Sequence, residues 1–304
     1  MSKEKPTFTG EPRRADERRD PDIAVVTCAL SGVLANRRQC AAIPYTPVEI
    51  AEEARRAYEA GASVVHIHAR NDDGSPTFSP AVFASIKEEI RRRCPIILNF
   101  STGTILDDVT DQCAYIRESK PEIAALNMGT MNYSKYSAKR KAFDFDMVFS
   151  NTYSKIIKLL AAMNEAGVKP ELECFDTGHT QGIKPLLDMG VLKGPLQFSF
   201  IVNVLGGIPG TVDSLQLQTR IMPAGSEWEV IGISHGQWRM LAAALVLGGN
   251  IRCGLEDHLY LPSGEMAKGN GELVEVAVRM VRDVGRRPAT VEEARQILSL
   301  GAAS

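Results

Sequence analysis

From Ile23 onward, short runs of apolar and β-branched residues alternate with longer segments in which apolar residues recur every three or four positions. The short runs have the length and composition of buried strands, and the longer segments have the period of helices that bury one face. Eight strands are predicted, at residues 23–26, 63–68, 95–100, 122–127, 171–175, 196–202, 228–233 and 250–256. This repeating order predicts an α/β fold.

Helices are predicted between these strands, at residues 46–61, 79–93, 151–166, 237–247 and 271–284. The first has the fullest set of signals. Thr46 is placed to cap it and Pro47 occupies its first turn. Ile50 and Ala54 lie on one apolar face, and Gly61 is placed to end the helix.

Eight strands separated by helices predict a (β/α)8 TIM barrel, because parallel neighbours need a crossover and a closed sheet has no edge to protect. An open doubly wound sheet is the main rival. No GxGxxG follows the first strand, and the glycine-rich turn at 205–210 lacks the lysine and hydroxyl of a phosphate-binding loop. We therefore predict a single barrel domain at 23–304. Residues 1–22 carry charges and prolines without an apolar core, so we expect a flexible arm and not a secretory signal.

Composition narrows the function classes. With 304 residues, 44% hydrophobic and 24% charged, the chain has the size and composition of one enzyme-sized globule. Its net charge of −2 supplies no basic face for nucleic acid, which favours small-molecule partners. No apolar stretch reaches the roughly 18 to 20 residues of a bilayer span, so we expect a cytoplasmic protein without membrane contact. Six cysteines without a CxxC pair predict reduced, buried thiols.

The sharpest chemical signal is VVHIHAR at 64–70. His66 and His68 are two residues apart at a strand end, so both imidazoles face the same side, and at a barrel's C-terminal rim that side is the mouth. Two neutral imidazoles at this spacing can bind one metal ion. The alternative is a pair of hydrogen-bonded core histidines.

A third ligand is expected from IRCGLED at 251–257. Strand alternation would place Arg252 and Glu256 on one face, with Asp257 just beyond the strand end. A buried glutamate needs a cation, which is either a metal or the neighbouring arginine. Two histidines and a glutamate form a known catalytic zinc set. The alternative is an Arg–Glu ion pair in the barrel floor.

Other strand ends carry weaker candidates. ELECFDTGH at 171–179 places Glu171 and Glu173 on one face, and Glu173 is a candidate substrate-binding residue. His179, in the loop that follows, is expected to support the site and not to bind metal. The polar, glycine-containing segments STGT at 101–104 and NMGT at 127–130 could hold a carboxylate.

Taken in order, VVHIHAR, NFSTGT, NMGT, ELECFDTGH and GLEDHLY resemble the β-keto acid cleavage enzymes, over about residues 22 to 300. The resemblance implies a TIM barrel, a Zn2+ ion held by His66, His68 and Glu256, and a homotetramer. It also implies that a 3-keto acid and acetyl-CoA give acetoacetate and a new acyl-CoA.

The resemblance also assigns roles. Asp257 matches the family's base and Arg252 the arginine that orients it. Thr102 and Asn127 are assigned to the substrate carboxylate, and Gly206 and Gly207 lie in a turn that the family places near CoA.

One position departs from the family pattern. Leu34 in SGVL stands where the family commonly has an acidic residue that, in the 3-keto-5-aminohexanoate cleavage enzymes, helps bind the substrate's amino group. An apolar side chain cannot compensate an ammonium, so we expect a 3-keto acid with a neutral or apolar tail. Arg37 and Arg38 nearby leave open a second substrate carboxylate.

Two further functions remain as alternatives. A metal-dependent hydrolase on the same barrel also uses an HxH strand, but normally the first strand, whereas here it is the second. A binding barrel without chemistry is disfavoured because Arg252, Glu256 and Asp257 would keep buried charge to no purpose.

Overall fold

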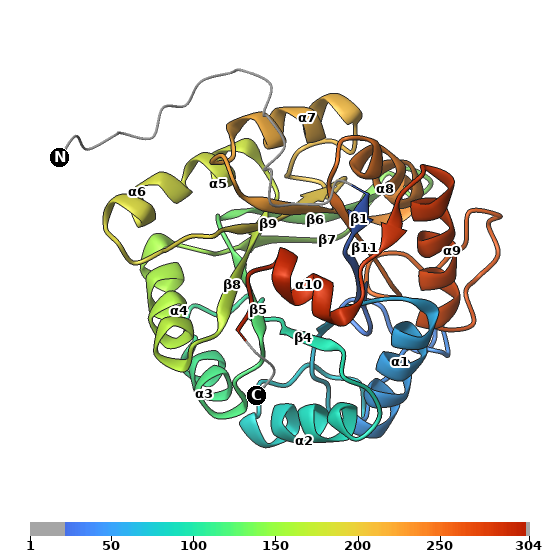
Figure 1. The fold of residues 1–304 in the computed structure, drawn as a ribbon, viewed down its shortest axis with the longest axis horizontal. Helices are drawn as coiled ribbons and strands as arrows, with labels where there is room; N and C mark the ends of the chain where they lie inside the picture. The colour runs from blue at the N-terminus through green and yellow to red at the C-terminus, as the bar shows by residue number, and fades with distance from the viewer. Residues whose placement is uncertain (1–21, 302–304) are drawn as a thin grey trace.

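The computed structural model describes residues 22–301, and all but one residue of the predicted N-terminal arm lie outside that range. Eight parallel strands close into a barrel in the order β10-β11-β2-β3-β4-β5-β8-β9 (Figure 1). They are β2 (Val26–Ala29), β3 (Val64–Ile67), β4 (Ile97–Phe100), β5 (Ile123–Asn127), β8 (Lys169–Cys174), β9 (Gln197–Val202), β10 (Glu227–Gly232) and β11 (Asn250–Cys253). The predicted TIM barrel is confirmed.

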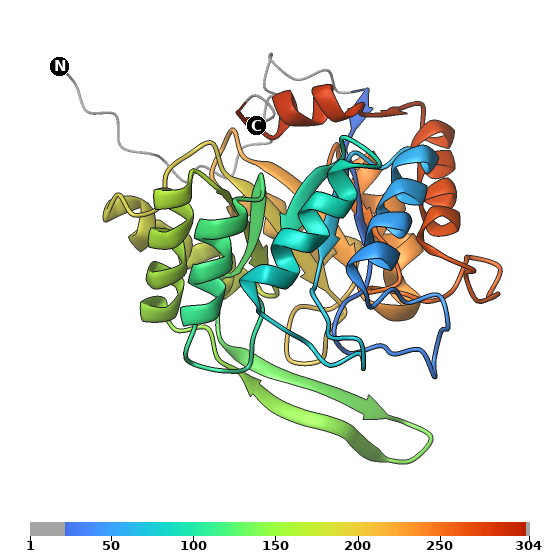
Figure 2. The same ribbon diagram turned by 90° about the horizontal axis from the view of Figure 1, so that it is seen from below.

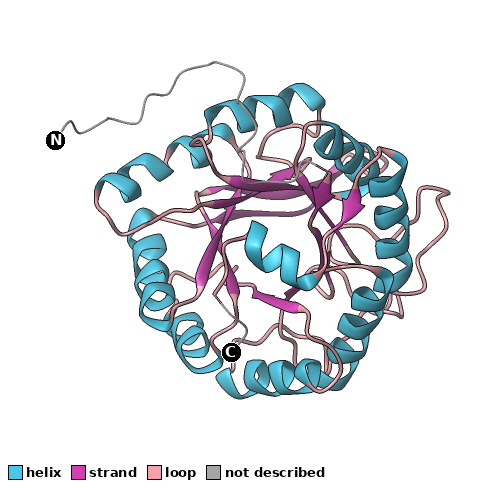
Figure 3. Ribbon diagram, in the orientation of Figure 1, coloured by secondary structure: helices cyan, strands magenta, loops and turns pink. Residues whose placement is uncertain are grey.

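Helices surround the strands on all sides (Figure 3). They are α1 (Pro47–Ala60), α2 (Pro80–Arg91), α3 (Thr110–Ser119), α4 (Tyr153–Ala166), α5 (Thr177–Gln181), α6 (Ile183–Asp188), α7 (Val212–Ile221), α8 (Gln237–Val246) and α9 (Asn270–Asp283). The end signals predicted for α1 are confirmed. Thr46 and Glu49 form a reciprocal capping box, and Gly61 ends the helix at a φ of 110°.

Three additions to the barrel were not predicted. A short strand pair joins β1 (Ile23–Ala24) to β12 (Arg287–Pro288). Helix α10 (Val291–Ile297) covers the N-terminal end of the barrel, where an apolar cluster unites Ala294 and Leu298 with residues that begin the strands. At the opposite end, a hairpin of β6 (Met131–Ser137) and β7 (Ala142–Phe149) projects from the body (Figure 2).

Two predicted strands differ from the observed ones by three residues at an end, whereas the limits of the other six agree within two residues. The first barrel strand is Val26–Ala29 and not 23–26, because Ile23–Ala24 pairs with β12 outside the barrel. The last strand ends at Cys253 and not at 256. There Gly254 adopts a φ of 143°, and a side chain at that position would lie 2.1 Å from the carbonyl oxygen of Ala29, so only glycine lets the chain turn this close to Ala29.

The prediction of buried, unpaired cysteines is confirmed. All six cysteines are free and buried. Within residues 22–301, no helix is long and apolar enough to cross a membrane.

Candidate metal and active site

Both histidines of the HxH motif lie at the C-terminal end of β3. His66 is the third residue of the strand and His68 follows its last residue. Their rings lie 5.2 Å apart at 65°, and His66 is buried. The alternation of a strand therefore presents both imidazoles to the same space, as predicted.

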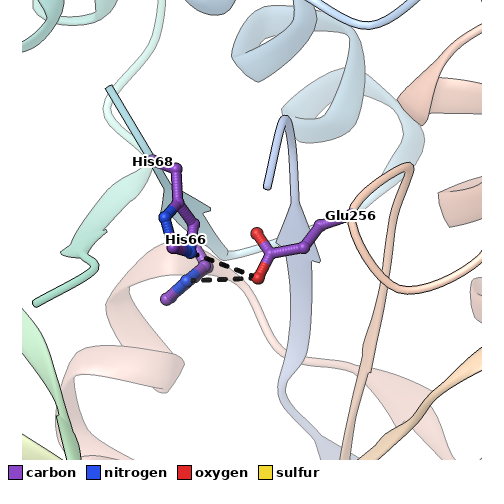
Figure 4. A group of neighbouring side chains, drawn as sticks. All are labelled: His66, His68 and Glu256. Carbon is purple, nitrogen blue, oxygen red and sulfur yellow. Dashed lines mark ion pairs between the residues drawn. The ribbon is translucent and has the colours of Figure 1, made fainter. Parts of the chain in front are cut away.

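Glu256 reaches this space by a route that differs from the prediction. It does not extend β11 but lies in the turn after Cys253, where its backbone N–H donates to the carbonyl of Ala29 at 3.2 Å. Its Oε1 lies 3.7 Å from His66 Nε2 and 3.4 Å from His68 Nε2 (Figure 4). The three side chains named from the sequence thus converge, but the turn and not strand alternation places the glutamate.

This trio fits a divalent metal such as zinc. Its three ligand atoms lie within 4.8 Å of one another. Two ligand atoms each about 2.1 Å from a tetrahedral zinc are about 3.4 Å apart, which is close to the separations found here. Glu256 Oε2 is buried without a hydrogen-bond partner among the described residues. A buried carboxylate oxygen left unsatisfied beside two imidazoles is the environment that a cation completes.

Arg252 links the candidate metal-binding trio (His66, His68 and Glu256) to the other acidic residues of the site. Its Nε and Nη2 donate to the two carboxylate oxygens of Asp257 at 3.0 and 2.9 Å. Nη2 also donates to Glu256 Oε1 at 2.7 Å, and Nη1 lies 3.5 Å from Glu173 Oε1. The Arg–Glu ion pair that the sequence left open is therefore present, alongside the metal-binding trio and not in its place.

Burial and charge set opposite protonation tendencies in neighbouring groups. Burial raises the pKa of Asp257 to about 6. The positive charge of Arg252 opposes this upward shift, and the negative charge of Glu256 adds to it. Burial also acts to raise the pKa of Glu256, but Arg252 and the two histidines hold it well below its usual range. Burial lowers the pKa of His66 well below its usual value. Neutral imidazole, ionised Glu256 and an Asp257 carboxyl of moderate basicity are the states that metal binding and proton abstraction require.

Glu173, the substrate-binding candidate from β8, lies among charged side chains. It is buried beside Arg252, and burial with the neighbouring Glu171 raises its pKa to about 8. His66, Glu171 and Glu173 could also surround a cation. The oxygens of Glu171 already accept hydrogen bonds from Asn99 and Ser199, so the trio with Glu256 is the better metal site.

The two residues assigned to the substrate carboxylate occupy neighbouring strand ends. Asn127 ends β5 and is buried, with its amide facing the backbone of Gly103. Thr102 is also buried, but its hydroxyl donates to the carbonyl of Ala125. Asn127 therefore has the more available donor of the two.

The glycine turn has a structural reason of its own. A Cβ on Gly206 would lie 1.9 Å from the carbonyl oxygen of Asn132, and one on Gly207 would lie 2.7 Å from that of Phe175. The turn thus lies against the hairpin and the end of β8, and close backbone approach alone requires both glycines.

Arg70, the last residue of VVHIHAR, has a role that the sequence analysis missed. It is buried and donates to the carbonyls of Gly32, Ser31 and Ala35 at 2.9, 3.0 and 2.7 Å. Gly32 lies directly against Glu256, so this loop borders the metal-binding trio. Leu34, in the same loop, is 54% exposed. An arginine two residues after the second histidine was the available signal.

The hairpin was also missed. The segment AFDFDMVF alternates apolar and polar residues over 142–149, which is a strand signal. Tyr133, from β6, packs with Phe175, Ile201 and Ile231 from the ends of β8, β9 and β10. The hairpin thereby contributes side chains to the mouth of the barrel.

Fold and site together define an enzyme class: a (β/α)8 barrel with a candidate metal-binding trio (His66, His68 and Glu256), a paired arginine and aspartate, and polar strand ends at its C-terminal mouth. Comparison with known families matches residues 24–300 to the β-keto acid cleavage enzymes. The chain belongs to this family and is an enzyme of it.

Curated relatives extend over nearly the whole chain. A 3-keto-5-aminohexanoate cleavage enzyme of Fusobacterium nucleatum is 39% identical over 277 residues, which are 91% of this chain and 97% of that protein. A 3,5-dioxohexanoate:acetyl-CoA acetone transferase of Paraburkholderia graminis is 30% identical over 299 residues, covering 92% and 96%. The family resemblance seen in the sequence is thus confirmed.

Among solved structures, the apo form of ObcA superposes with a TM-score of 0.72 at 20% identity, covering 85% of this chain and 66% of ObcA. At that identity the likeness supports the barrel fold alone.

Proposed function

We propose that the protein is a zinc-dependent β-keto acid cleavage enzyme that converts a 3-keto acid and acetyl-CoA into acetoacetate and a new acyl-CoA. The observation that carries the proposal is the convergence of His66, His68 and Glu256 beside an Asp257 held by Arg252. The names of the relatives support it, since several describe transfer between a keto acid and acetyl-CoA.

The metal-binding trio would hold the zinc. When bound, zinc would act as a Lewis acid on the 3-keto oxygen and the carboxylate of the substrate, which lowers the pKa of the C2 protons between them. Asn127, with Thr102 once its hydroxyl turns from Ala125, would bind the substrate carboxylate. Glu173, whose Oε1 lies 3.5 Å from Arg252 Nη1, would be a further substrate-binding residue, as expected from the sequence.

Asp257 is the base. It takes a proton from C2, while two hydrogen bonds from Arg252 hold its carboxylate in one orientation. The resulting carbanion adds to the thioester carbonyl of acetyl-CoA, and the CoA thiolate leaves. The thiolate then adds to C3, the C2–C3 bond breaks, and the proton held by Asp257 returns to C2. Acetoacetate and the new acyl-CoA are the products.

The loop that borders Glu256 suggests the substrate's tail. Leu34 offers no charge to an ammonium group, which favours a neutral or apolar tail. Arg37 is less available for a second carboxylate than the sequence suggested, because it forms an ion pair with Glu49 at 2.5 Å and lies over the ring of Tyr45. A neutral tail is therefore our proposal, with a second carboxylate bound by Arg38 as the alternative.

Mass spectrometry of products tests this function. The purified protein would be incubated with acetyl-CoA labelled in the acetyl group and a panel of 3-keto acids that includes 3-ketohexanoate and 5-amino-3-ketohexanoate. We expect labelled acetoacetate and an unlabelled acyl-CoA that carries the tail of the keto acid. A metal-dependent hydrolase would instead turn over its substrate without acetyl-CoA, and that result would contradict the proposal.

Two further expectations belong to the same proposal. Metal analysis should find one zinc per chain. Sedimentation should find a homotetramer, as the family resemblance implies.

A further inference from the structure

The hairpin places a phenol at the mouth of the barrel. Tyr133 lies on β6, and its ring lies 5.8 Å from that of Phe149 and 6.1 Å from that of Phe175, both at steep angles. It is also stacked with Phe145 at 5.9 Å. Rings on three sides leave this side chain little freedom.

The hairpin itself is anchored over the ends of the strands. Ser134 pairs with Leu205 in an isolated bridge, and the turn at Gly206 lies against the backbone of Asn132. Tyr133 is thus flanked by two residues that contact the loop after β9. The position of its ring is therefore set by the barrel and not by a free arm.

The phenol lies at the mouth of the barrel, where its ring packs with Phe175, Ile201 and Ile231 at the ends of β8, β9 and β10. Burial raises the pKa of Tyr133 to about 12, and the charges of Glu256, Asp257 and Glu173 act in the same direction. The hydroxyl therefore stays protonated and can act as a hydrogen-bond donor. Within residues 22–301, its hydroxyl has no hydrogen-bond partner.

We infer that Tyr133 is a further catalytic residue, whose hydroxyl donates a hydrogen bond to the thioester carbonyl oxygen of acetyl-CoA as that oxygen becomes an alkoxide. This inference rests on the proposed function. In the proposed function, the bound zinc and Asn127 would hold the substrate's keto oxygen and carboxylate. The thioester oxygen gains negative charge when the C2 carbanion adds to its carbon, and a fixed donor aimed at developing charge stabilises that step. No proton is transferred, so the phenol is unchanged at the end of the reaction.

The test separates the two halves of the reaction. Tyr133→Phe removes the hydroxyl and keeps the three ring contacts. Exchange of the C2 protons with D2O, followed by NMR without acetyl-CoA, reports proton abstraction. Full turnover with acetyl-CoA reports the addition. We expect kcat to fall on the order of 100-fold with C2 exchange and zinc content near wild type. Tyr136→Phe, the matched control on the same strand, removes the hydroxyl of a residue that is 49% exposed and should leave both rates unchanged.

Two results would overturn the inference: a kcat within twofold of wild type, or equal losses of exchange and turnover, which would place the hydroxyl on the keto acid or indicate a structural role. Wild-type protein without acetyl-CoA-dependent turnover would instead remove the proposed function, and this inference with it.

Discussion

Arg252 binds both carboxylate oxygens of Asp257, through Nε at 3.0 Å and Nη2 at 2.9 Å. The same guanidinium contacts Glu256, the carboxylate of the metal-binding trio. One side chain therefore fixes the position of the proposed base, Asp257, relative to that of the proposed metal ligand, Glu256. A planar group with several donors suits this task in a way that a lysine would not.

The first prediction concerns the base. Asp257→Asn keeps the shape of the side chain but cannot accept a proton from C2. We expect turnover to fall at least about 100-fold, while bound zinc stays at the wild-type level. Steady-state kinetics together with metal analysis checks this. Asp188→Asn is the control, because this aspartate is exposed on α6 and pairs with Lys184 of the same helix. Wild-type turnover in Asp257→Asn would exclude Asp257 as the base.

Removal of the third ligand should have a different result. Glu256→Ala leaves two imidazoles, which hold zinc weakly compared with three ligands. We expect both bound metal and activity to be lost, whereas Glu88→Ala, at an exposed position on α2, should change neither. Metal content measured after dialysis against a chelator is the readout. If Glu256→Ala retained full metal content, the site assignment would be wrong.

Leu34→Glu should change substrate preference. A carboxylate in this loop can pair with an ammonium on the substrate's tail and disfavours an apolar one. We expect the ratio of kcat/KM for 5-amino-3-ketohexanoate to that for 3-ketohexanoate to rise about tenfold or more. Leu34→Gln is the matched control without charge. A wild-type enzyme that already preferred the amino-bearing acid would contradict the argument from Leu34.

Lys169, at the start of β8, gives a prediction about stability. Burial lowers its pKa to about 8, although it donates a hydrogen bond to the carbonyl of Leu298. Because the folded-state pKa is below the unfolded value, the unfolded chain binds more protons between about pH 8 and 10.5, and this residue's contribution to stability rises with pH across that window. Below about pH 8 Lys169 is charged in the folded protein, and burial of that charge then lowers the free energy of unfolding by its full amount.

The comparison is between wild type and Lys169→Met in urea unfolding at pH 7.5 and pH 10. We expect the difference in their free energies of unfolding to change by at most about 3 kcal/mol, in favour of wild type at the higher pH. Lys193→Met, at an exposed position, should show no such change. If the difference between the two free energies of unfolding did not change with pH, folding would not lower the pKa of Lys169, and the prediction would be wrong.

Much of the fold could be predicted because its signals are local. Strand residues show their burial in short apolar runs, and Thr46, Pro47 and Gly61 mark the ends of α1 through contacts within one or two turns. The HxH motif belongs to the same class, since the spacing of His66 and His68 within one strand decides that they face the same way. The hairpin was not predicted although its alternation is equally local, because an antiparallel pair outside the barrel has no place in the repeating strand–helix order that identifies the fold.

The sequence by itself determined which groups are available: two imidazoles on one strand face, and an arginine, a glutamate and an aspartate near the end of another. Only the tertiary structure decided how they meet. Glu256 reaches the histidines because Gly254 turns the chain under the carbonyl of Ala29, and Tyr133 reaches the mouth because a hairpin follows β5. Both placements depend on contacts between segments far apart in the chain. Periodicity reports only whether a residue is buried and on which face, so it carries no information about which distant segment lies opposite.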